Sequence, residues 1–273
     1  MKTVKREGKT ALVTGAASGL GAEFAVLLAK DSYNLVLVDV DGNNLRDVKE
    51  RVQKTYNVHI KVIEKDLSEP NVAQDIFESI NGISLDVLIN NAGFGLFGPF
   101  CDTEWHRESE MLFLHINTTT QLTKLALKIM LKQGYGKILN VSSLAAFQPG
   151  PLMSIYYASK AYILSFSEAI ANVVKHTGVT VTVLCPGQTK TSFQATVSKS
   201  SLQNQNHFKM ACPLRVAKYG YDSMLKGKTV VVPGRVNKFL ALISRFIPRN
   251  TATSIVRRIQ EVNRFKQANY NNS

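Results

Sequence analysis

The stretch "ALVTGAASGLGAEFAVLLAK", residues 11–30, decides the fold. It begins with a short apolar run typical of a buried strand and ends with an alanine- and leucine-rich run typical of a helix. Between them, Gly15, Gly19 and Gly21 follow the spacing G-x3-G-x-G. Glycines let the backbone turn tightly and approach a ligand, and a helix N-terminus offers free N–H groups to a pyrophosphate. The stretch therefore predicts a strand, a dinucleotide-binding turn and a helix, with tight packing of strand on helix as the alternative.

Apolar, β-branched runs recur along the chain and alternate with helix-like segments. They occupy residues 10–14, 34–40, 58–66, 85–91, 136–143, 179–186 and 228–234. Runs that are apolar throughout indicate strands covered on both faces, and alternation with helices indicates parallel pairing. We therefore expect a Rossmann-type, doubly wound α/β fold with a seven-stranded parallel sheet and helices on both faces, formed by one domain over residues 1–233.

Residues 234–273 differ from this domain and form a basic, amphipathic C-terminal extension. From Thr229 onward eight basic residues stand against one acid, Glu261, so this region supplies about +7 of the formal net charge of +13. Such a segment suits weak contact with an anionic membrane surface or a cap over a lipid-like substrate. The alternative is a helix packed on its own domain or on a partner subunit, with a solvated basic face.

The composition, with 45% hydrophobic residues, is ordinary for a folded protein. No run approaches the ~18–20 apolar residues of a membrane span and no signal peptide precedes the first strand, so we expect a cytoplasmic location. Cys101, Cys185 and Cys212 are widely spaced, which fits reduced thiols, and the histidines form no ligand-spaced cluster, so no metal is expected. The basic residues match no recognisable reading motif, which argues against nucleic-acid binding.

Asp39, in "LVLVDVDG", closes the second predicted strand. In dinucleotide-binding folds the residue at this position faces the adenosine ribose. A carboxylate accepts hydrogen bonds from the 2′-hydroxyl of NAD but repels the 2′-phosphate of NADP. Asp39 therefore favours NAD(H) over NADP(H), although an exposed strand-end aspartate that starts a turn is a common alternative.

Tyr156 and Lys160 stand four residues apart in a predicted helix that begins at Ser154 and stops at Gly178. At this spacing the two side chains share one helix face, and a nearby ammonium favours the phenolate. We therefore expect the pKa of Tyr156 to fall below its usual value of about 10, which would let it exchange a proton near neutral pH. The alternative is a buried helix with an aromatic ridge and a snorkelling lysine.

Seven short segments, in order, resemble the motifs of the short-chain dehydrogenase/reductase family. They are "TGAASGLG" (14–21), "KDL" (65–67), "NNAG" (90–93), "HIN" (115–117), "NVSS" (140–143), "YYASK" (156–160) and "PGQTKT" (186–191). The resemblance covers about the first 190 residues. It implies hydride transfer between a nicotinamide and a secondary alcohol or ketone, in a homodimer or homotetramer joined through the helices that carry Asn117 and Tyr156.

The resemblance also assigns roles to individual residues. Tyr156 would be the catalytic acid/base, Lys160 the residue that lowers its pKa, Ser143 the donor to the substrate oxygen, and Asn117 the asparagine that keeps a helix open and holds a water behind the lysine. The cofactor would contact Gly15, Ser18, Gly19, Leu20, Gly21, Asp39, Asp66, Leu67, Asn91, Ala92, Gly93, Tyr156, Lys160, Pro186, Gly187, Thr189 and Thr191.

Substrate specificity in this family resides in three loops, here residues 93–105, 144–156 and 191–215. Their apolar side chains would form a pocket for a hydrophobic acyl-chain or steroid-like substrate, with about half of them expected to pack elsewhere instead. These side chains are Phe94, Leu96, Phe97, Phe147, Leu152, Met153 and Phe193.

The extension resembles that of a family branch of general or acyl-chain ketoreductases, which commonly carry Ala-Arg where this chain has Asp39-Val40. Members of that branch use NADP, so the departure argues for NAD and weakens the transfer of a substrate from that branch. Two other classes of function remain open: a non-catalytic NAD-binding regulatory module, and a peripheral membrane protein that acts through its basic tail.

Overall fold

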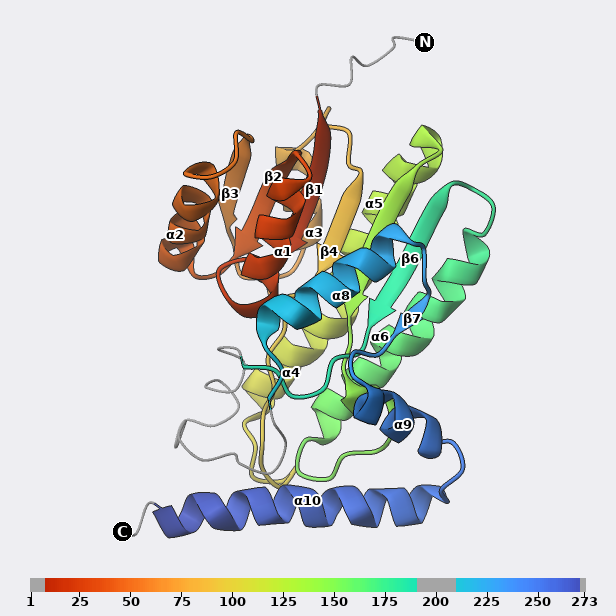
Figure 1. Cartoon of the computed structure of the whole chain (residues 1–273). Helices are drawn as coiled ribbons and strands as arrows, with labels where there is room; N and C mark the ends of the chain where they lie inside the picture. The colour runs from red at the N-terminus through yellow and green to blue at the C-terminus, as the bar shows by residue number, and fades with distance from the viewer. Residues whose placement is uncertain (1–7, 191–209, 271–273) are drawn as a thin grey trace.

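The computed structural model describes residues 8–190 and 210–270, and side chains up to residue 262. Seven parallel strands form one sheet in the order β3-β2-β1-β4-β5-β6-β7 (Figure 1). The strands are β1 (Lys9–Thr14), β2 (Tyr33–Asp39), β3 (Ile60–Glu64), β4 (Val87–Asn90), β5 (Gly136–Val141), β6 (Val179–Leu184) and β7 (Val230–Val231). The strand order reverses between β1 and β4, which is where a doubly wound sheet opens a crevice for ligands. The predicted fold class is confirmed.

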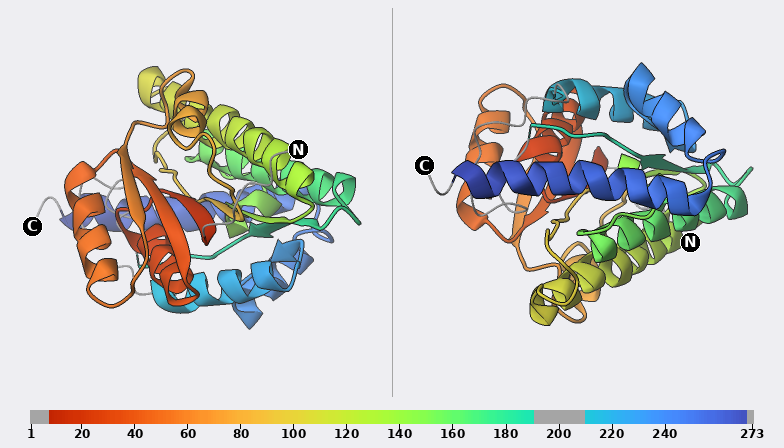
Figure 2. Two further views of the ribbon diagram at one scale, coloured as in Figure 1. Left: turned by 90° about the horizontal axis from the view of Figure 1, so that it is seen from above. Right: turned by 90° about the horizontal axis from the view of Figure 1, so that it is seen from below.

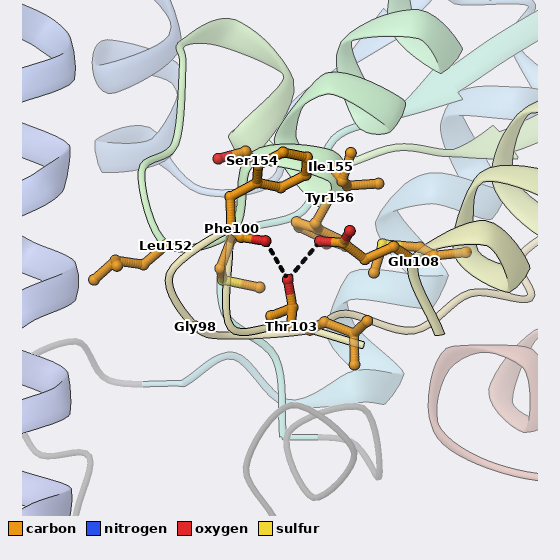
Figure 3. A pocket seen from close by; sticks show the side chains of 11 residues that line it. Gly98, Phe100, Thr103, Glu108, Leu152, Ser154, Ile155 and Tyr156 are labelled. Carbon is orange, nitrogen blue, oxygen red and sulfur yellow. Dashed lines mark hydrogen bonds between the residues drawn. The ribbon is translucent and has the colours of Figure 1, made fainter. Parts of the chain in front are cut away.

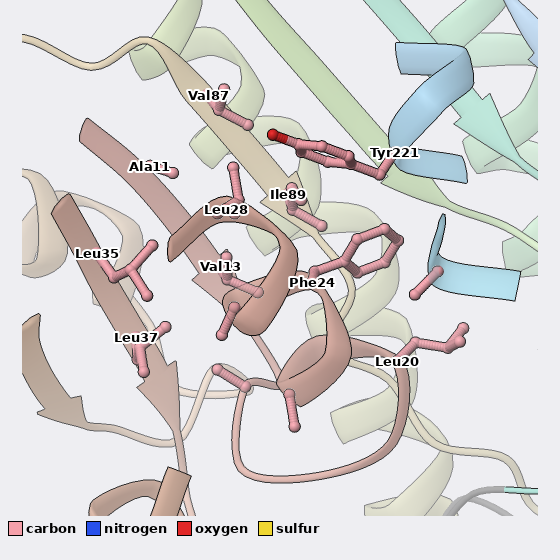
Figure 4. Packing of buried hydrophobic residues seen from close by; sticks show 14 of the residues in the cluster. Ala11, Val13, Leu20, Phe24, Leu28, Leu35, Leu37, Val87, Ile89 and Tyr221 are labelled. Atoms are coloured by element: carbon pink, nitrogen blue, oxygen red, sulfur yellow. The ribbon is translucent and has the colours of Figure 1, made fainter. Parts of the chain in front are cut away.

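Helices cover both faces of the sheet. One face carries α1 (Gly19–Lys30), α2 (Gly42–Gln53) and α8 (Pro213–Leu225), and the other carries α3 (Val72–Ser79), α5 (Thr119–Gln133) and α6 (Ser154–Val173). Successive residues of β1 show the reason, since Ala11 and Val13 pack with Phe24 of α1 whereas Leu12 packs with Ile76 of α3 (Figure 4). Alternate side chains of a strand point to opposite faces, so a sheet buried on both sides needs the uninterrupted apolar runs that the sequence shows.

The strands are shorter than the runs that predicted them. β4 stops at Asn90, β5 at Val141 and β6 at Leu184, so the polar residues after them leave the ladder. β7 is reduced to two residues, Val230–Val231. Because parallel strands all end at the same edge, these released segments gather there, which is the usual position of a ligand site in such sheets.

The C-terminal extension forms α9 (Arg235–Ile243) and α10 (Arg249–Tyr270). α10 lies across the molecule below the edge where the strands end (Figures 1 and 2). The extension is anchored by three buried side chains, Ala241 of α9 and Ala252 and Val256 of α10. Within the described ranges, no helix is both long and apolar enough to cross a membrane.

Candidate active site

Ser143, Tyr156 and Lys160 meet at the carboxyl edge of β5. Ser143 follows this strand and caps the short 3₁₀ helix η2 (Leu144–Phe147), where its Oγ accepts a hydrogen bond from the Ala145 N–H at 3.1 Å. Tyr156 and Lys160 lie in the first two turns of α6, which begins at Ser154 as predicted but ends at Val173, before Gly178. Both side chains are buried, and the Tyr156 hydroxyl shares a hydrogen bond with the Ser143 side chain. The structure therefore brings three of the four predicted catalytic residues together.

The predicted fall in the pKa of Tyr156 is wrong. Burial disfavours the phenolate and raises the pKa of Tyr156 to about 12, although the hydrogen bond from Ser143 opposes this rise. Lys160 does not offset the burial, because its Nζ stands 5.7 Å from the centre of the phenol ring and donates to the Val141 carbonyl at 3.1 Å. Tyr156 is therefore a protonated acid at neutral pH in this structure.

Lys160 is itself perturbed by the site. Burial disfavours its ammonium form and lowers the pKa of Lys160 to about 8, with a weak opposing effect from Cys185. Ser142 fixes the helix at this point, since its Oγ donates to the Lys160 carbonyl at 2.7 Å. The lysine is thus held in place but is close to losing its proton under mildly basic conditions.

The glycine turn has the close backbone packing that a dinucleotide site requires. Gly15 and Gly19 both have positive φ, at 63° and 53°. A Cβ on Gly21 would stand 1.9 Å from the Gly15 carbonyl oxygen, so only glycine fits there. Asn91 closes the turn from the next strand, because its Nδ2 donates to the carbonyls of Thr14 and Gly15, both at 3.0 Å. The turn and the start of α1 therefore form a cradle that fits a pyrophosphate.

Asp39 lies beside this cradle at the end of β2. Its Oδ2 accepts from the Ala17 N–H at 2.9 Å and its Oδ1 from the Asp41 N–H at 3.1 Å. Asp66 is farther along the same edge and accepts from Ser68, through both the backbone N–H and the hydroxyl. The carboxylate of Asp39 is half-buried and keeps lone pairs that could accept from a ribose.

The remaining predicted cofactor residues lie in five places. Ala92 and Gly93 follow β4, where the Ala92 N–H donates to Thr14 Oγ1 at 3.1 Å and Gly93 borders Lys160. Ser18 is the N-cap of α1, whereas the side chains of Leu20 and Leu67 are buried in the core, so only their backbones could reach a ligand. Pro186, Gly187 and Thr189 follow β6, where a Cβ on Gly187 would stand 2.7 Å from Asn237 of α9. Thr191 lies outside the described residues.

A family model described as short chain dehydrogenase matches residues 9–202. This chain belongs to the short-chain dehydrogenase family. It is 34% identical over 182 residues to the 17-beta-hydroxysteroid dehydrogenase type 3 of Mus musculus, covering 66% of this chain and 59% of that protein's length. It is 30% identical over 187 residues to a 7beta-hydroxysteroid dehydrogenase of Mediterraneibacter gnavus, covering 68% of this chain and 71% of that one.

Solved structures of short-chain dehydrogenases have the same fold. One from a study of 7beta-hydroxysteroid dehydrogenase stereoselectivity aligns with a TM-score of 0.83 at 26% identity, over 94% of this chain and 99% of that one. A short-chain dehydrogenase from Sphingobium yanoikuyae in complex with NADPH aligns with a TM-score of 0.77 at 24% identity, over 87% of this chain and 93% of that one.

The structure places Asn117 where the helix is open, as predicted, but does not bring its side chain to the other catalytic residues. Asn117 lies in a π-helical turn, η1 (Phe113–Thr118), but its side chain is exposed and accepts from Gln121 Nε2 at 2.6 Å. His115 occupies the interior position instead and is fully buried next to Gly93 and Lys160. Residues two apart on a helix face opposite sides, so only one of the two can point inward.

The cavity beside Tyr156 is small, about 10 Å³, and its wall combines apolar side chains with polar ones and one charged group (Figure 3). Of the predicted pocket residues, Leu96, Leu152 and Met153 line it. Phe94 packs against the Tyr156 cluster and the core without lining the cavity, and Phe147 packs against a core cluster. Phe97 is absent from the lining, and Phe193 lies outside the described residues. The structure adds members that sequence reasoning missed: Gly98, Phe100, Thr103, Glu108, Met111, Ser154 and Ile155.

Glu108 is the charged group in the wall of this cavity. It lies in α4 (Trp105–Leu112), is buried, and accepts a hydrogen bond from the Thr103 hydroxyl at 2.7 Å (Figure 3). Among the residues that the structure describes, no three histidine, cysteine or acidic side chains gather in a way that could hold a metal ion.

Proposed function

We propose that this chain is an NAD(P)-dependent oxidoreductase that transfers a hydride between a nicotinamide and the carbon of a secondary alcohol or ketone. The observation that carries the proposal is the convergence of Ser143, Tyr156 and Lys160 at the same sheet edge as the cradle of Gly15 and Gly21. Hydride transfer is the chemistry of the cofactor, so the chain has only to hold both reactants and to manage one proton.

Tyr156 supplies that proton to the substrate oxygen in the direction of ketone reduction. It is buried and protonated at neutral pH, because its pKa is raised to about 12, and it lines the cavity where a substrate would bind. The Ser143 hydroxyl is hydrogen-bonded to the Tyr156 hydroxyl. It can turn to donate to the substrate oxygen as negative charge develops there. Lys160 is anchored by its bond to the Val141 carbonyl, with its Nζ 5.7 Å from the centre of the Tyr156 ring.

Incubation with nucleotide deuterated at its transferable position tests this proposal. A mixture of deuterated NADH, deuterated NADPH and hydrophobic ketones should give an alcohol that carries deuterium on the carbinol carbon, which mass spectrometry detects. The proposal fails if the nucleotides bind but no deuterium enters any product, and the non-catalytic NAD-binding module then becomes the better account.

The substrate is proposed to be a hydrophobic carbonyl or alcohol of steroid or acyl-chain type. The apolar side chains of Leu96, Leu152, Met153 and Ile155 in the cavity wall support this class. The cavity of about 10 Å³ has room for one water molecule, so its wall must move apart to admit such a substrate. The two relatives described above are named as hydroxysteroid dehydrogenases, and a 32% identical one from Danio rerio is named as a very-long-chain 3-oxoacyl-CoA reductase. Competition between a steroid ketone, a 3-oxoacyl-CoA and a small polar ketone at equal concentration separates these classes.

NAD(H) is proposed as the preferred cofactor because Asp39 ends β2 beside the cradle. A 2′-phosphate placed there would meet the carboxylate, and the nearest basic residue in the sequence after it, Arg46, is bonded to Glu64 and Asn43. Asp39→Ala should weaken NADH binding and improve NADPH binding, by about tenfold each in a fluorescence titration. Equal nucleotide preference in wild type and variant would contradict the role of Asp39.

We also propose that the outer face of α9 rests weakly on anionic membrane. Ala241 turns inward, whereas Val236, Phe239, Leu242 and Phe246 are each more than half exposed. Three cations flank this apolar face on the same helix and the turn after it, namely Arg235, Lys238 and Arg245. An apolar stripe bordered by cations is the pattern of an interfacial helix.

Vesicle sedimentation tests this contact. Wild type should sediment with vesicles that contain an anionic lipid and less with neutral ones, and Phe239→Glu should abolish the difference. Ile83→Glu, which adds a charge at an exposed residue outside the extension, serves as the control. Equal sedimentation of all three proteins would overturn the contact, and loss of the membrane role would leave the oxidoreductase proposal intact.

A homo-oligomer in a cytoplasmic location completes the proposal. Tyr162 and Phe166 stack on α6 with ring centres 5.7 Å apart, and the Tyr162 hydroxyl is within 3.0 Å of Thr120 on α5. This partly exposed aromatic surface spans the two helices that the family resemblance assigns to the subunit interface. Light scattering of the full chain should report a dimer or tetramer, and Tyr162→Glu should give monomers. A wild-type monomer would contradict the assembly.

A further inference from the structure

His115 stands between the catalytic helix and the segment that follows β4. Its Nδ1 is 2.8 Å from Ser159 Oγ on α6, and its Nε2 accepts a hydrogen bond from the Phe94 N–H at 3.3 Å. The imidazole is fully buried, and its ring centre is 6.0 Å from that of Tyr156. A Cβ built on Gly93 would stand 2.6 Å from Nε2 and 3.4 Å from Lys160 Nζ, so the imidazole and the ammonium both border this glycine.

The hydrogen bonds around His115 fix which nitrogen carries the proton. Ser159 Oγ has one hydrogen, and it donates this to the Tyr156 carbonyl at 2.8 Å. Nδ1 must therefore carry a hydrogen and donate it to Ser159 Oγ, while Nε2 must keep its lone pair for the Phe94 N–H. A second proton on Nε2 would break the bond to Phe94 and would place a cation beside Lys160.

The titratable groups near His115 also keep it neutral. Burial and the charge of Lys160 hold the pKa of His115 well below its usual range. Tyr156 on α6 is the other titratable group next to the ring, and Arg107 of α4 lies beyond Phe94, with its guanidinium 4.7 Å from the centre of the Phe94 ring. Neither is a carboxylate that would favour an imidazolium.

We propose that His115 is a positioning residue for the reaction, and that as a neutral Nδ1–H imidazole it holds Tyr156 and Lys160 in register with the Gly93–Phe94 segment. The inference rests on the proposed function, because that segment is the one expected to lie under the nucleotide. One ring bonds to both elements, so it fixes the distance from the Tyr156 hydroxyl to whatever the segment carries. A change of 1 Å in such a distance lowers rates substantially.

Kinetics of three variants test the positioning role. His115→Phe keeps the ring but removes both hydrogen bonds, and we expect kcat to fall by about 10–100-fold with little change in nucleotide Kd. His115→Gln can restore one bond and should recover part of this loss. Lys124→Ala, at an exposed position of α5, is the control and should retain full kcat. A folded His115→Phe protein with wild-type kcat would overturn the proposal, as would a Lys124→Ala protein that is equally damaged.

The pH profile separates positioning from proton transfer by His115. If the imidazole stays neutral, wild type and His115→Gln share the same acid limb of kcat/KM. An acid limb near the ordinary pKa of histidine, about 6.5, that disappears in His115→Gln would mean that His115 titrates, and the proposal would be wrong.

Two readouts do not need turnover and so distinguish failure of this inference from failure of the proposed function. Nitrogen NMR of histidine-labelled protein, assigned with His115→Phe, should show one neutral Nδ1–H imidazole across about pH 6 to 9. Hydrogen exchange of the Phe94 amide should accelerate by more than about tenfold in His115→Phe. If no substrate turns over but both results hold, the proposed function fails while the positions assigned to His115 stand. A titrating imidazole or an unchanged Phe94 amide overturns the inference in either case.

Discussion

Gln260 Nε2 on α10 donates a hydrogen bond to the Tyr157 hydroxyl at 3.1 Å. The same amide lies 3.9 Å from the Met153 sulfur, in the wall of the substrate cavity. Tyr157 is adjacent in sequence to Tyr156, so the C-terminal extension bonds directly to the first turn of the catalytic helix. α10 therefore supports the loop over the cavity.

Loss of the bond between Gln260 and Tyr157 should loosen this loop. For Gln260→Ala we expect KM for a bulky hydrophobic substrate to rise by about 3–10-fold with kcat nearly unchanged, because a net hydrogen bond contributes about 1 kcal/mol. Ser254→Ala on the exposed part of the same helix is the control and should behave as wild type. Steady-state kinetics decide the matter, and an unchanged KM in Gln260→Ala would show that α10 does not shape the cavity.

Gly21→Ala should impair nucleotide binding and stability together. The added Cβ would stand 1.9 Å from the Gly15 carbonyl oxygen, so the cradle must open. Overpacking of this kind costs about 1–3 kcal/mol, and we expect nucleotide Kd to rise by more than about tenfold. Gly82→Ala is the control, because a Cβ there meets nothing within 4 Å and only its positive φ is strained. Equal Kd values for both variants, measured by titration, would show that the turn is not the phosphate site.

Lys160→Met should stabilise the fold at neutral pH while it lowers activity. The pKa of Lys160 is about 8 in the folded protein and about 10.4 when unfolded, so between these values the unfolded chain binds the extra proton. Stability then rises with pH across this window, and below it the buried ammonium costs on the order of 1–3 kcal/mol. Methionine removes this cost together with the bond to Val141.

Urea denaturation at about pH 7 and about pH 10 measures the predicted difference. The advantage of Lys160→Met over wild type should shrink at the higher pH, where wild-type Lys160 is already neutral. Exposed Lys132→Met should show no such pH-dependent gap. A gap in stability that is the same at both pH values would show that burial does not perturb Lys160.

The sequence was sufficient to predict the sheet, because its continuous apolar runs and the Gly15, Gly19 and Gly21 turn depend only on local patterns. It was also sufficient to bring Ser143, Tyr156 and Lys160 to one place. It predicted Asn117 of "HIN" for the site and gave His115 no role, because the π-helical turn that points His115 inward depends on tertiary packing. The pattern of polar and apolar residues around this segment does not show which face of the helix is buried.

The direction of the Tyr156 pKa shift was also beyond the sequence. The i and i+4 spacing predicts proximity of the ammonium, but burial of the phenol and the bond from Lys160 to Val141 reverse the outcome. The sequence also did not predict Glu108 as the charged group in the cavity wall, for a similar reason. Glu108 is in a polar helical stretch that looks solvent-exposed, and only the fold shows that it is buried against Thr103.

The most direct test of the central claim compares wild type, Tyr156→Phe and Tyr157→Phe in ketone reduction with NADH, followed by nicotinamide absorbance. We predict that Tyr156→Phe loses about 10²–10⁴-fold in kcat and binds NADH as wild type does, whereas Tyr157→Phe keeps kcat within about threefold. Wild-type turnover by Tyr156→Phe, or a greater loss in Tyr157→Phe, would contradict the assignment of Tyr156 as the proton donor.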